Sequence, residues 1–326
     1  MKKVTLPEDI PGKDELYKAR SRIAGKVHAT PLLSSDTLNR RFGAQIYFKA
    51  ENFQKAGAFK SRGAVNAVFA LSAKDAARGV CTHSSGNHAQ ALARAAGLRN
   101  IPAYIVMPET APRAKVAAVK TYGGRITFCK PTLESRESTL KQVMAETGAT
   151  EIHPYNHPLV IAGQSTVASE IAEQMDKEPD IILTPVGGGG LLSGTALAVH
   201  HFYSATRVYA AEPEGADDAY RSFKSGELIP SVNPNTIADG LLTSLGSRTF
   251  PVIVNYVDDI VTVKDSSVIE AMKFIWERMK IIVEPSACVT LAAILEHKIE
   301  VKNKTAVLVL SGGNLDLDRL PWQNIQ

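Results

Sequence analysis

One lysine in this chain is flanked by residues that could present its amine to a carbonyl compound. Lys60 lies between Phe59 and Ser61, and Gly57 frees the backbone three residues earlier. A lysine amine forms a Schiff base with a carbonyl compound once its surroundings lower its pKa. A lone lysine at the start of a helix more often points into water, so Lys60 by itself does not identify a reactive site.

A run of glycines supplies a loop that could bind an anion. The run follows the apolar stretch 181–186 and consists of Gly187, Gly188, Gly189 and Gly190. Without side chains its amides can close on a phosphate, and a following helix adds a favourable dipole. No G-x-G-x-x-G register fits, because Leu192 and Ser193 occupy the places of the last glycine, and no Walker lysine follows. The run predicts a phosphate site rather than a nucleotide site; a tight turn without a ligand is the alternative.

Two further loops combine hydroxyl, amide and glycine residues after expected strands. The first is Ser84-Ser85-Gly86-Asn87-His88, and the second is Ser311-Gly312-Gly313-Asn314. The amides and hydroxyls of the first loop could bind a carboxylate where the next helix begins. Each loop alone is equally well explained as a helix cap or a strand-end turn. His88 alone would more often be a structural histidine than a catalyst.

An acidic loop follows the strand expected over 207–211. Residues 212–218 read E-P-E-G-A-D-D, and hard cations bind carboxylate and carbonyl oxygens. A solvated acidic loop is the alternative at this point.

The order of apolar and amphipathic segments predicts an α/β fold. Short strands are expected at 45–50, 80–83, 103–107, 125–129, 181–186, 207–211 and 305–310. Helices are expected at 14–23, 63–71, 89–96, 112–122, 134–147, 162–175, 191–201, 268–279 and 287–297. This alternation is typical of parallel sheet covered by helices on both faces, with ligands at the carboxyl ends of strands. All the loops above follow strands, so we expect one site rather than four.

Composition excludes several classes of protein. The chain has 326 residues, 44% hydrophobic content and a net charge of +4, with no basic run interleaved with aromatics, so nucleic acid is not expected as a partner. Neither a signal peptide nor a membrane-spanning run is expected. Cys81, Cys129 and Cys288 lie far apart, which argues against a disulfide framework or a zinc site and favours the reducing cytoplasm.

Taken together, these motifs resemble the fold-type II pyridoxal-phosphate enzymes, and within them the serine racemase and serine/threonine dehydratase family. Further matching segments are I-A-D-G at 237–240, W-E-R-M-K at 276–280 and V-E-P at 283–285, so the resemblance extends from about residue 15 to 318. It implies a fold like that of the tryptophan synthase β chain, with two domains, each an open, mostly parallel sheet flanked by helices. The large cofactor-binding domain would comprise residues 1–52 and 154–326, and the small substrate-closing domain 53–153.

The resemblance also implies a role for each singled-out residue. Lys60 would form the Schiff base with pyridoxal phosphate, Phe59 would pack nearby, and Asn87 would hydrogen-bond the phenolic oxygen of the ring. The glycine run would hold the phosphate, and Ser311 would contact the pyridine nitrogen. The substrate carboxylate would be received by Ser84, Ser85, His88 and Arg136. The acidic loop would bind Mg2+, or Ca2+ or Mn2+, through Glu212, the Ala216 carbonyl and Asp218.

The implied chemistry is elimination and proton exchange on a small hydroxy amino acid. Lys60 would remove the Cα proton, and departure of the β-hydroxyl would lead to a keto acid and ammonia. Return of a proton by Ser85 on the opposite face would give the mirror-image amino acid. Many threonine dehydratases that resemble this chain carry alanine at the position of Ser85, so its serine favours the racemases and the hydroxyaspartate dehydratases. A neutral Ser311 at the pyridine nitrogen suits these reactions better than transamination.

Several alternatives stay open at this stage. Dehydration of threo-3-hydroxyaspartate would need an extra cation for the second carboxylate. A non-catalytic metabolite-binding protein on the same fold is a different class, against which Lys60 and Ser85 both argue. ATP stimulates some relatives at a subunit interface, where Lys55 is a candidate contact, and the resemblance implies a homodimer. The chain ends soon after Asn314, so no C-terminal regulatory domain and no feedback control by isoleucine are expected.

Overall fold

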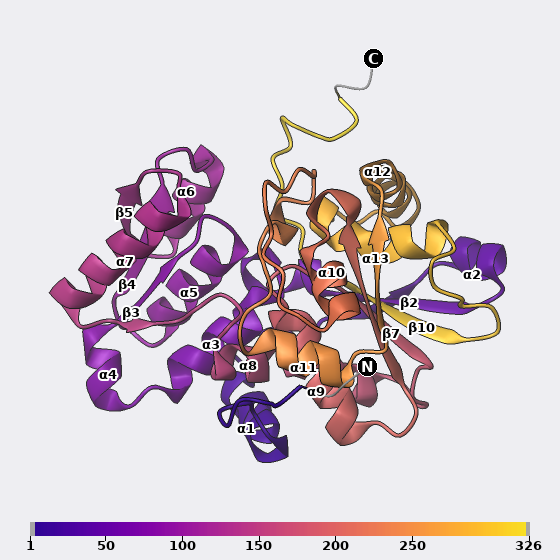
Figure 1. Cartoon of the computed structure of the whole chain (residues 1–326), viewed down its shortest axis with the longest axis horizontal. Helices are drawn as coiled ribbons and strands as arrows, with labels where there is room; N and C mark the ends of the chain where they lie inside the picture. Colours follow the sequence, from indigo (N-terminus) through magenta and orange to yellow (C-terminus); the bar gives the residue numbers. More distant parts are fainter. Residues whose placement is uncertain (1–3, 324–326) are drawn as a thin grey trace.

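The computed structural model describes residues 4–323 and contains two sheets flanked by helices (Figure 1). A six-stranded sheet has the order β1-β2-β10-β7-β8-β9, and a four-stranded sheet has the order β5-β4-β3-β6. Within the described residues the strands are β1 (Leu32–Ser34), β2 (Gln45–Ala50), β3 (Val80–His83), β4 (Ala103–Pro108), β5 (Arg125–Cys129), β6 (Thr150–Glu151), β7 (Ile181–Pro185), β8 (Arg207–Pro213), β9 (Asp259–Val263) and β10 (Thr305–Leu310). The predicted α/β class is confirmed.

The helices cover both faces of each sheet, as expected for parallel strands. Their bounds are α1 (Lys13–Ile23), α2 (Asp36–Phe42), α3 (Lys60–Ala70), α4 (Ala73–Arg78), α5 (Asn87–Leu98), α6 (Arg113–Thr121), α7 (Leu133–Thr147), α8 (Pro158–Gln174), α9 (Gly190–Phe202), α10 (Asp218–Ser225), α11 (Thr249–Tyr256), α12 (Asp265–Phe274) and α13 (Pro285–Leu295). None of the helices in residues 4–323 is long and apolar enough to cross a membrane.

The six-stranded sheet is parallel except for its short first strand. β1 pairs antiparallel with β2, whereas β2, β10, β7, β8 and β9 run parallel. Alternate residues of the central strands enter two different cores: Leu183 and Leu308 pack with α12 and α13, and Ile182 and Val307 pack with α8, α9 and α11. Because both faces are covered, these strands read as continuous apolar runs.

The four-stranded sheet is parallel throughout. Val80 and Ile105 pack against α3 and α5 on one face, whereas Cys81, Val106 and Cys129 pack against α7 on the other. The three cysteines are buried free thiols, as expected for small core residues. The strands of this sheet all come from residues 80–151, inside the predicted small domain, while the domain boundaries themselves stay a prediction.

Several elements start or end at other residues than the sequence predicts, and three of these shifts have a clear structural cause. The helix expected from residue 63 already begins at Lys60, because the amides of Ser61 and Arg62 bond to the carbonyls of Ala58 and Phe59. The helix expected over 268–279 is α12 followed by a single π-helical turn, Ile275–Met279. The strand expected to end at 211 continues to 213, since β8 stays paired with β9.

The longer β8 corrects the predicted acidic loop. Glu212 pairs with Thr262 of β9 and is buried, so it belongs to the strand and not to a solvated loop. The strand β9 and the helices α10 and α11 were not expected, because their sequences are short and lie among polar loops. Their packing around β8 buries Glu212 and Asp218, whereas Glu214 stays exposed.

Helices α3 and α8 cross in backbone contact between the two sheets (Figure 1). A Cβ added at Gly163 would lie 2.5 Å from the Cα of Gly63 and 2.7 Å from the carbonyl oxygen of Arg62. The amide of Gly63 donates to the side-chain oxygen of Gln164 at 3.2 Å. Only glycine permits this approach, and the crossing lies three residues beyond Lys60.

We therefore predict that Gly163→Ala destabilises the fold by about 1–3 kcal/mol, the usual cost of overpacking. Urea unfolding of the purified variant measures this free energy. Gly97→Ala in α5 is the matched control, since the nearest atom to its added Cβ is 3.6 Å away. Equal stability of the two variants would contradict the proposed tight crossing.

Candidate active site

Lys60 is the first residue of α3, and its amine lies beside a main-chain carbonyl. Its Nζ donates to the Pro154 carbonyl at 2.9 Å and lies 5.0 Å from the centroid of the Phe59 ring. Burial lowers the pKa of Lys60 to about 8, although the carboxylate of Glu284 works in the opposite direction. The alternative of a lysine in water is therefore excluded: with this pKa roughly a tenth of the amine is neutral at pH 7, far more than for a lysine in water.

The glycine run joins β7 to α9 and is enclosed by side chains. A Cβ at Gly188 would lie 2.3 Å from the ring of Tyr155, and one at Gly189 would lie 2.8 Å from Ile253. Gly189 also has a φ of 86°, a left-handed conformation that favours glycine. Thr249 Oγ1 donates to the Gly188 carbonyl at 2.8 Å and fixes the loop. The loop ends at the N-terminus of a 13-residue helix, a position suited to a phosphate.

The loop after β3 leads into α5 without a side-chain cap. The residue before this helix is Gly86, which offers no cap, so the simple capping explanation of Ser84–Asn87 does not apply. The amide of Ser84 bonds to the Val106 carbonyl at 3.1 Å and continues the β3–β4 ladder. The first amides of α5 are thereby directed out of the sheet edge, where they can bind a carboxylate.

His88 presents an acceptor rather than a donor. Its Nε2 lies 2.8 Å from the Ile152 carbonyl, which can only accept, so Nε2 carries the proton. Burial, and then the charge of Lys60, lower the pKa of His88 to about 3, which keeps the ring neutral. Its Nδ1 is buried without a hydrogen-bond partner among the residues described. A carboxylate can therefore bind the main-chain amide of His88 but not its imidazole.

The segment 153–157 lines the site and was missed by the sequence reasoning. Nδ1 of His153 accepts the amide of Asn156 at 3.0 Å, and its ring centroid lies 4.6 Å from that of Tyr155. The same ring lies 6.3 Å from the ring of His83, the last residue of β3. Burial lowers the pKa of His153 to about 3, so it too is neutral. The available signal was the position of His153 and Tyr155 just after a strand, β6, too short to recognise.

Glu284 joins the ends of β3 and β10. Nδ2 of Asn87 donates to both its carboxylate oxygens, at 3.0 and 3.1 Å, and the Asn314 amide donates at 3.1 Å. Burial raises the pKa of Glu284 to about 7. The carbonyl of Ser311 accepts the Phe59 amide at 3.0 Å, which ties the end of β10 to the start of α3. Glu284 lies in one of the matching motifs but had no predicted site role.

Arg136 lies in the first turn of α7 and faces the end of β3. Its charge contributes, after burial, to lowering the pKa of His83. Its Nε is buried without a hydrogen-bond partner within the described residues. An unpartnered guanidinium nitrogen close to the Ser84–Ser85 loop is well placed for an anion.

The predicted metal residues gather at the end of β8. Glu212 accepts the amides of Ala219 and Tyr220, and burial raises its pKa to about 9 and that of Asp218 to about 6. Oδ2 of Asp218 is buried and has no hydrogen-bond partner in the described part of the chain. Within residues 4–323 no group of three or more His, Cys, Asp or Glu residues could hold a metal. The predicted set instead combines two carboxylates with the Ala216 carbonyl.

The strand-end loops thus gather a desolvated lysine amine, a phosphate cradle and an anion-binding helix start. This is the class of site that holds pyridoxal phosphate, and the donor set fits that cofactor: an amine for its aldehyde and glycine amides for its phosphate. The chain belongs to the family described as pyridoxal-phosphate dependent enzyme, whose model matches residues 23–312. It has the fold of the fold-type II members, as the sequence motifs predicted.

The similar proteins are racemases and dehydratases. A beta-hydroxyaspartate dehydratase of Paracoccus denitrificans is 51% identical over 96% of this chain and 99% of its own length. A serine racemase of Dictyostelium discoideum is 48% identical over 94% of this chain and 95% of its own length. The structure of maize serine racemase superposes with a TM-score of 0.92 at 47% identity, covering 94% of each chain.

The lowered pKa of Lys60 predicts its reactivity in the cofactor-free protein. Only the neutral amine is a nucleophile, so acylation of Lys60 should increase as the pH rises through about 8. Limiting acetic anhydride followed by peptide mass analysis measures this midpoint. Glu284→Gln removes a charge that raises the pKa of Lys60, so in this variant the midpoint should shift to lower pH. A midpoint near 10.5, the ordinary pKa of a lysine amine, would contradict the desolvated site.

Proposed function

We propose that this chain racemises serine and dehydrates serine and threonine, giving D-serine, or a keto acid with ammonia, with pyridoxal phosphate as cofactor. The observation that carries the proposal is the desolvated amine of Lys60 at the same strand-end site as the Ser85 loop. The similarity to a serine racemase over nearly the whole chain supports it. A binding protein without catalysis would need neither a lysine of lowered pKa nor Ser85.

The residues of the site divide between cofactor and substrate. Lys60 would hold the cofactor covalently, the glycine run 187–190 its phosphate, and Asn87 and Ser311 its ring, with Phe59 packed alongside. The bound cofactor supplies an acceptor for the electrons left when the Cα proton departs. The substrate carboxylate would bind the first amides of α5, including that of His88, with Ser84, Ser85 and Arg136 around it.

Two bases on opposite faces of one carbon explain both products. Lys60 takes the Cα proton on its own face, which requires the neutral amine that its lowered pKa provides. Ser85 holds or returns a proton on the other face, which inverts the centre. If, after Lys60 has taken the Cα proton, the β-hydroxyl is protonated and leaves as water before Ser85 returns a proton, the same binding mode gives dehydration.

Dehydration of threo-3-hydroxyaspartate is a second candidate activity. With this substrate the first carboxylate would bind the amides of α5, which would leave the unpartnered Nε of Arg136 for the second carboxylate. The similarity to a beta-hydroxyaspartate dehydratase supports this activity as well.

A divalent cation, an activator and a partner subunit complete the proposal. Glu212, the Ala216 carbonyl and Asp218 would hold Mg2+, Ca2+ or Mn2+, and the unpartnered oxygen of Asp218 supports a cation there. ATP binding near Lys55 and a homodimer are carried over from the resemblance. Three buried free thiols agree with the predicted cytoplasmic location.

Product analysis tests the proposed function directly. With L-serine, L-threonine and threo-3-hydroxyaspartate supplied separately, keto acid and D-isomer are each followed over time. We expect D-serine and pyruvate from L-serine, and loss of D-serine with partial retention of pyruvate in Ser85→Ala. Lys60→Ala is the control that should lose both. Unchanged D-serine formation by Ser85→Ala would show that another group serves the opposite face.

Removal of the divalent cation should destabilise the protein. A cation must displace the proton that burial keeps on Glu212 at neutral pH, and its binding to the folded state alone stabilises that state. Chelation should lower the melting temperature and activity of the wild type, and added Mg2+ should restore both. Asp218→Asn should respond far less to the chelator. A wild type unaffected by chelation would contradict the proposed metal site.

A further inference from the structure

Four charged side chains lie behind the helix that carries Lys60. Arg62, Lys49 and Glu51 are fully buried, and the side chain of Glu170 is only 13% exposed. The two positive and two negative charges cancel, so the cluster as a whole is neutral. We refer to these residues as the buried charge cluster.

Arg62 binds both carboxylates with two bonds each. Its Nε and Nη2 lie 2.7 Å from the two oxygens of Glu51. Its Nη1 and Nη2 lie 2.6 and 2.7 Å from the two oxygens of Glu170. Such paired bonds fix the plane and direction of the guanidinium as well as its distance. Although burial lowers the pKa of Arg62, the two carboxylates raise it overall above its usual value.

The cluster compensates for an unfavourable helix start. The first turn of α3 holds the cations Lys60 and Arg62, no acidic residue and no side-chain cap. Positive charge at a helix N-terminus is destabilising, because the helix dipole is positive there. A buried guanidinium without its partners would be costlier still. Glu51 and Glu170 therefore stabilise the turn that Lys60 begins.

Glu170 connects this turn to the other wall of the site. It lies on α8, the helix that follows Pro154 and begins at Pro158, and the Pro154 carbonyl accepts the Lys60 amine. Helix α8 thus binds Arg62 through Glu170 near its C-terminal end, and its N-terminal end follows Pro154, whose carbonyl accepts the Lys60 amine. Lys49, on β2, donates to Glu170 at 2.7 Å and to the Thr30 carbonyl at 2.8 Å.

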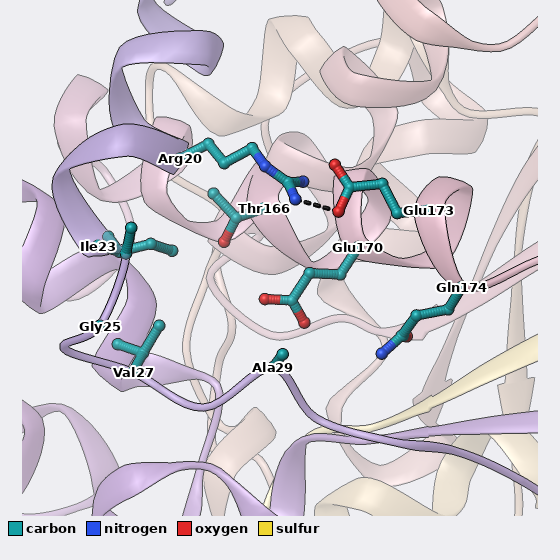
Figure 2. Close-up of a pocket in the computed structure, with 10 residues that line it drawn as sticks. Arg20, Ile23, Gly25, Val27, Ala29, Thr166, Glu170, Glu173 and Gln174 are labelled. Carbon is teal, nitrogen blue, oxygen red and sulfur yellow. Dashed lines mark hydrogen bonds and ion pairs between the residues drawn. The ribbon is translucent and has the colours of Figure 1, made fainter.

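One member of the buried charge cluster, Glu170, lines a cavity (Figure 2). This cavity, of about 350 Å3, lies between α1, the loop after it and α8. Figure 2 shows Glu170 pointing into it, next to Glu173, which pairs with Arg20. The side chain of Glu173 is 56% exposed, so it offers a control on the same helix that lies outside the buried charge cluster.

We propose that Glu170 is a positioning residue for the reaction: through Arg62 it holds the first turn of α3 so that the Lys60 amine meets the Cα proton of the substrate. This inference rests on the proposed function and deepens it. Glu170 touches neither substrate nor cofactor. Its effect on proton transfer falls mainly on the face of the substrate that Lys60 serves, whereas Ser85 lies on the loop after β3 and is not among the hydrogen-bond partners of Arg62 in the described residues.

Proton exchange measured separately on the two faces of the substrate Cα distinguishes a positioning effect from a general loss of stability. In D2O the loaded enzyme exchanges the Cα proton of L-serine through Lys60 and that of D-serine through Ser85. We expect Glu170→Gln to slow L-serine exchange by roughly 10- to 100-fold, as a misplacement of about 1 Å would. D-serine exchange should change far less, so the ratio of the two rates falls. Glu173→Gln should leave the ratio at the wild-type value.

A double variant separates the loss of the Glu170 bonds from the net charge that Glu170→Gln leaves in the buried charge cluster. Lys49→Met together with Glu170→Gln deletes one charge of each sign, so the cluster stays neutral and the double variant should unfold at a higher temperature than Glu170→Gln. The paired bonds between Arg62 and Glu170 are still lost, so the low ratio of L-serine to D-serine exchange should persist. This variant also carries the test if Glu170→Gln does not fold. A normal ratio in either variant would overturn the proposal.

Borohydride reduction of the bound cofactor, which requires no turnover, tests the positioning role of Glu170 separately from the proposed two-base function. If the wild type exchanges neither enantiomer, the two-base function fails, and positioning is judged from the fraction of bound pyridoxal phosphate that borohydride fixes to the chain. Glu170→Gln should bind the cofactor through the intact glycine loop and yet show a lower fixed fraction than Glu173→Gln. Equal fractions in the two variants would then reject the positioning role.

Discussion

The site depends on holding a helix that begins with two cations against a second helix. Arg62 cannot be buried without Glu51 and Glu170, and α3 cannot approach α8 without Gly63 and Gly163. These requirements reinforce each other, since the paired bonds draw together the same helices whose backbones are in contact. As a result, the backbone of Lys60, at the start of α3, is held in a fixed position. The low pKa of its amine then follows from burial beside the Pro154 carbonyl.

Around this fixed helix, parallel strands bring together groups that are far apart in the sequence. The ends of β3 and β10 meet through Asn87, Glu284 and Asn314, and the end of β7 supplies the glycine loop. Burial then sets the protonation of each group: it keeps His88 neutral and raises the pKa of Glu284 to about 7. Desolvation thus determines whether these side chains are protonated, and with it whether each can act as an acid or as a base.

Local patterns in the sequence predicted what depends on local structure. The strand 45–50, the helix start near Lys60 and the glycine run were all recognisable, because periodicity and glycine requirements act over a few residues. The roles of Glu170 and Tyr155 were not, since they arise from contacts with α3 and with the glycine loop across long sequence separations. Likewise, only the Ile152 carbonyl reveals which nitrogen of His88 carries the proton. The buried position of Glu212 depends on pairing with β9, a strand that the sequence reasoning did not identify.

The most direct test of the account is to locate the covalently held cofactor on the chain. The purified protein, loaded with pyridoxal phosphate, is reduced with borohydride and digested, and the modified peptide is sequenced by mass spectrometry. The structure predicts modification at Lys60 alone, since its desolvated amine lies beside the Pro154 carbonyl, next to Tyr155, which packs against the glycine loop. Modification at another lysine, with Lys60 left free, would contradict the central claim that these loops form one site around that amine.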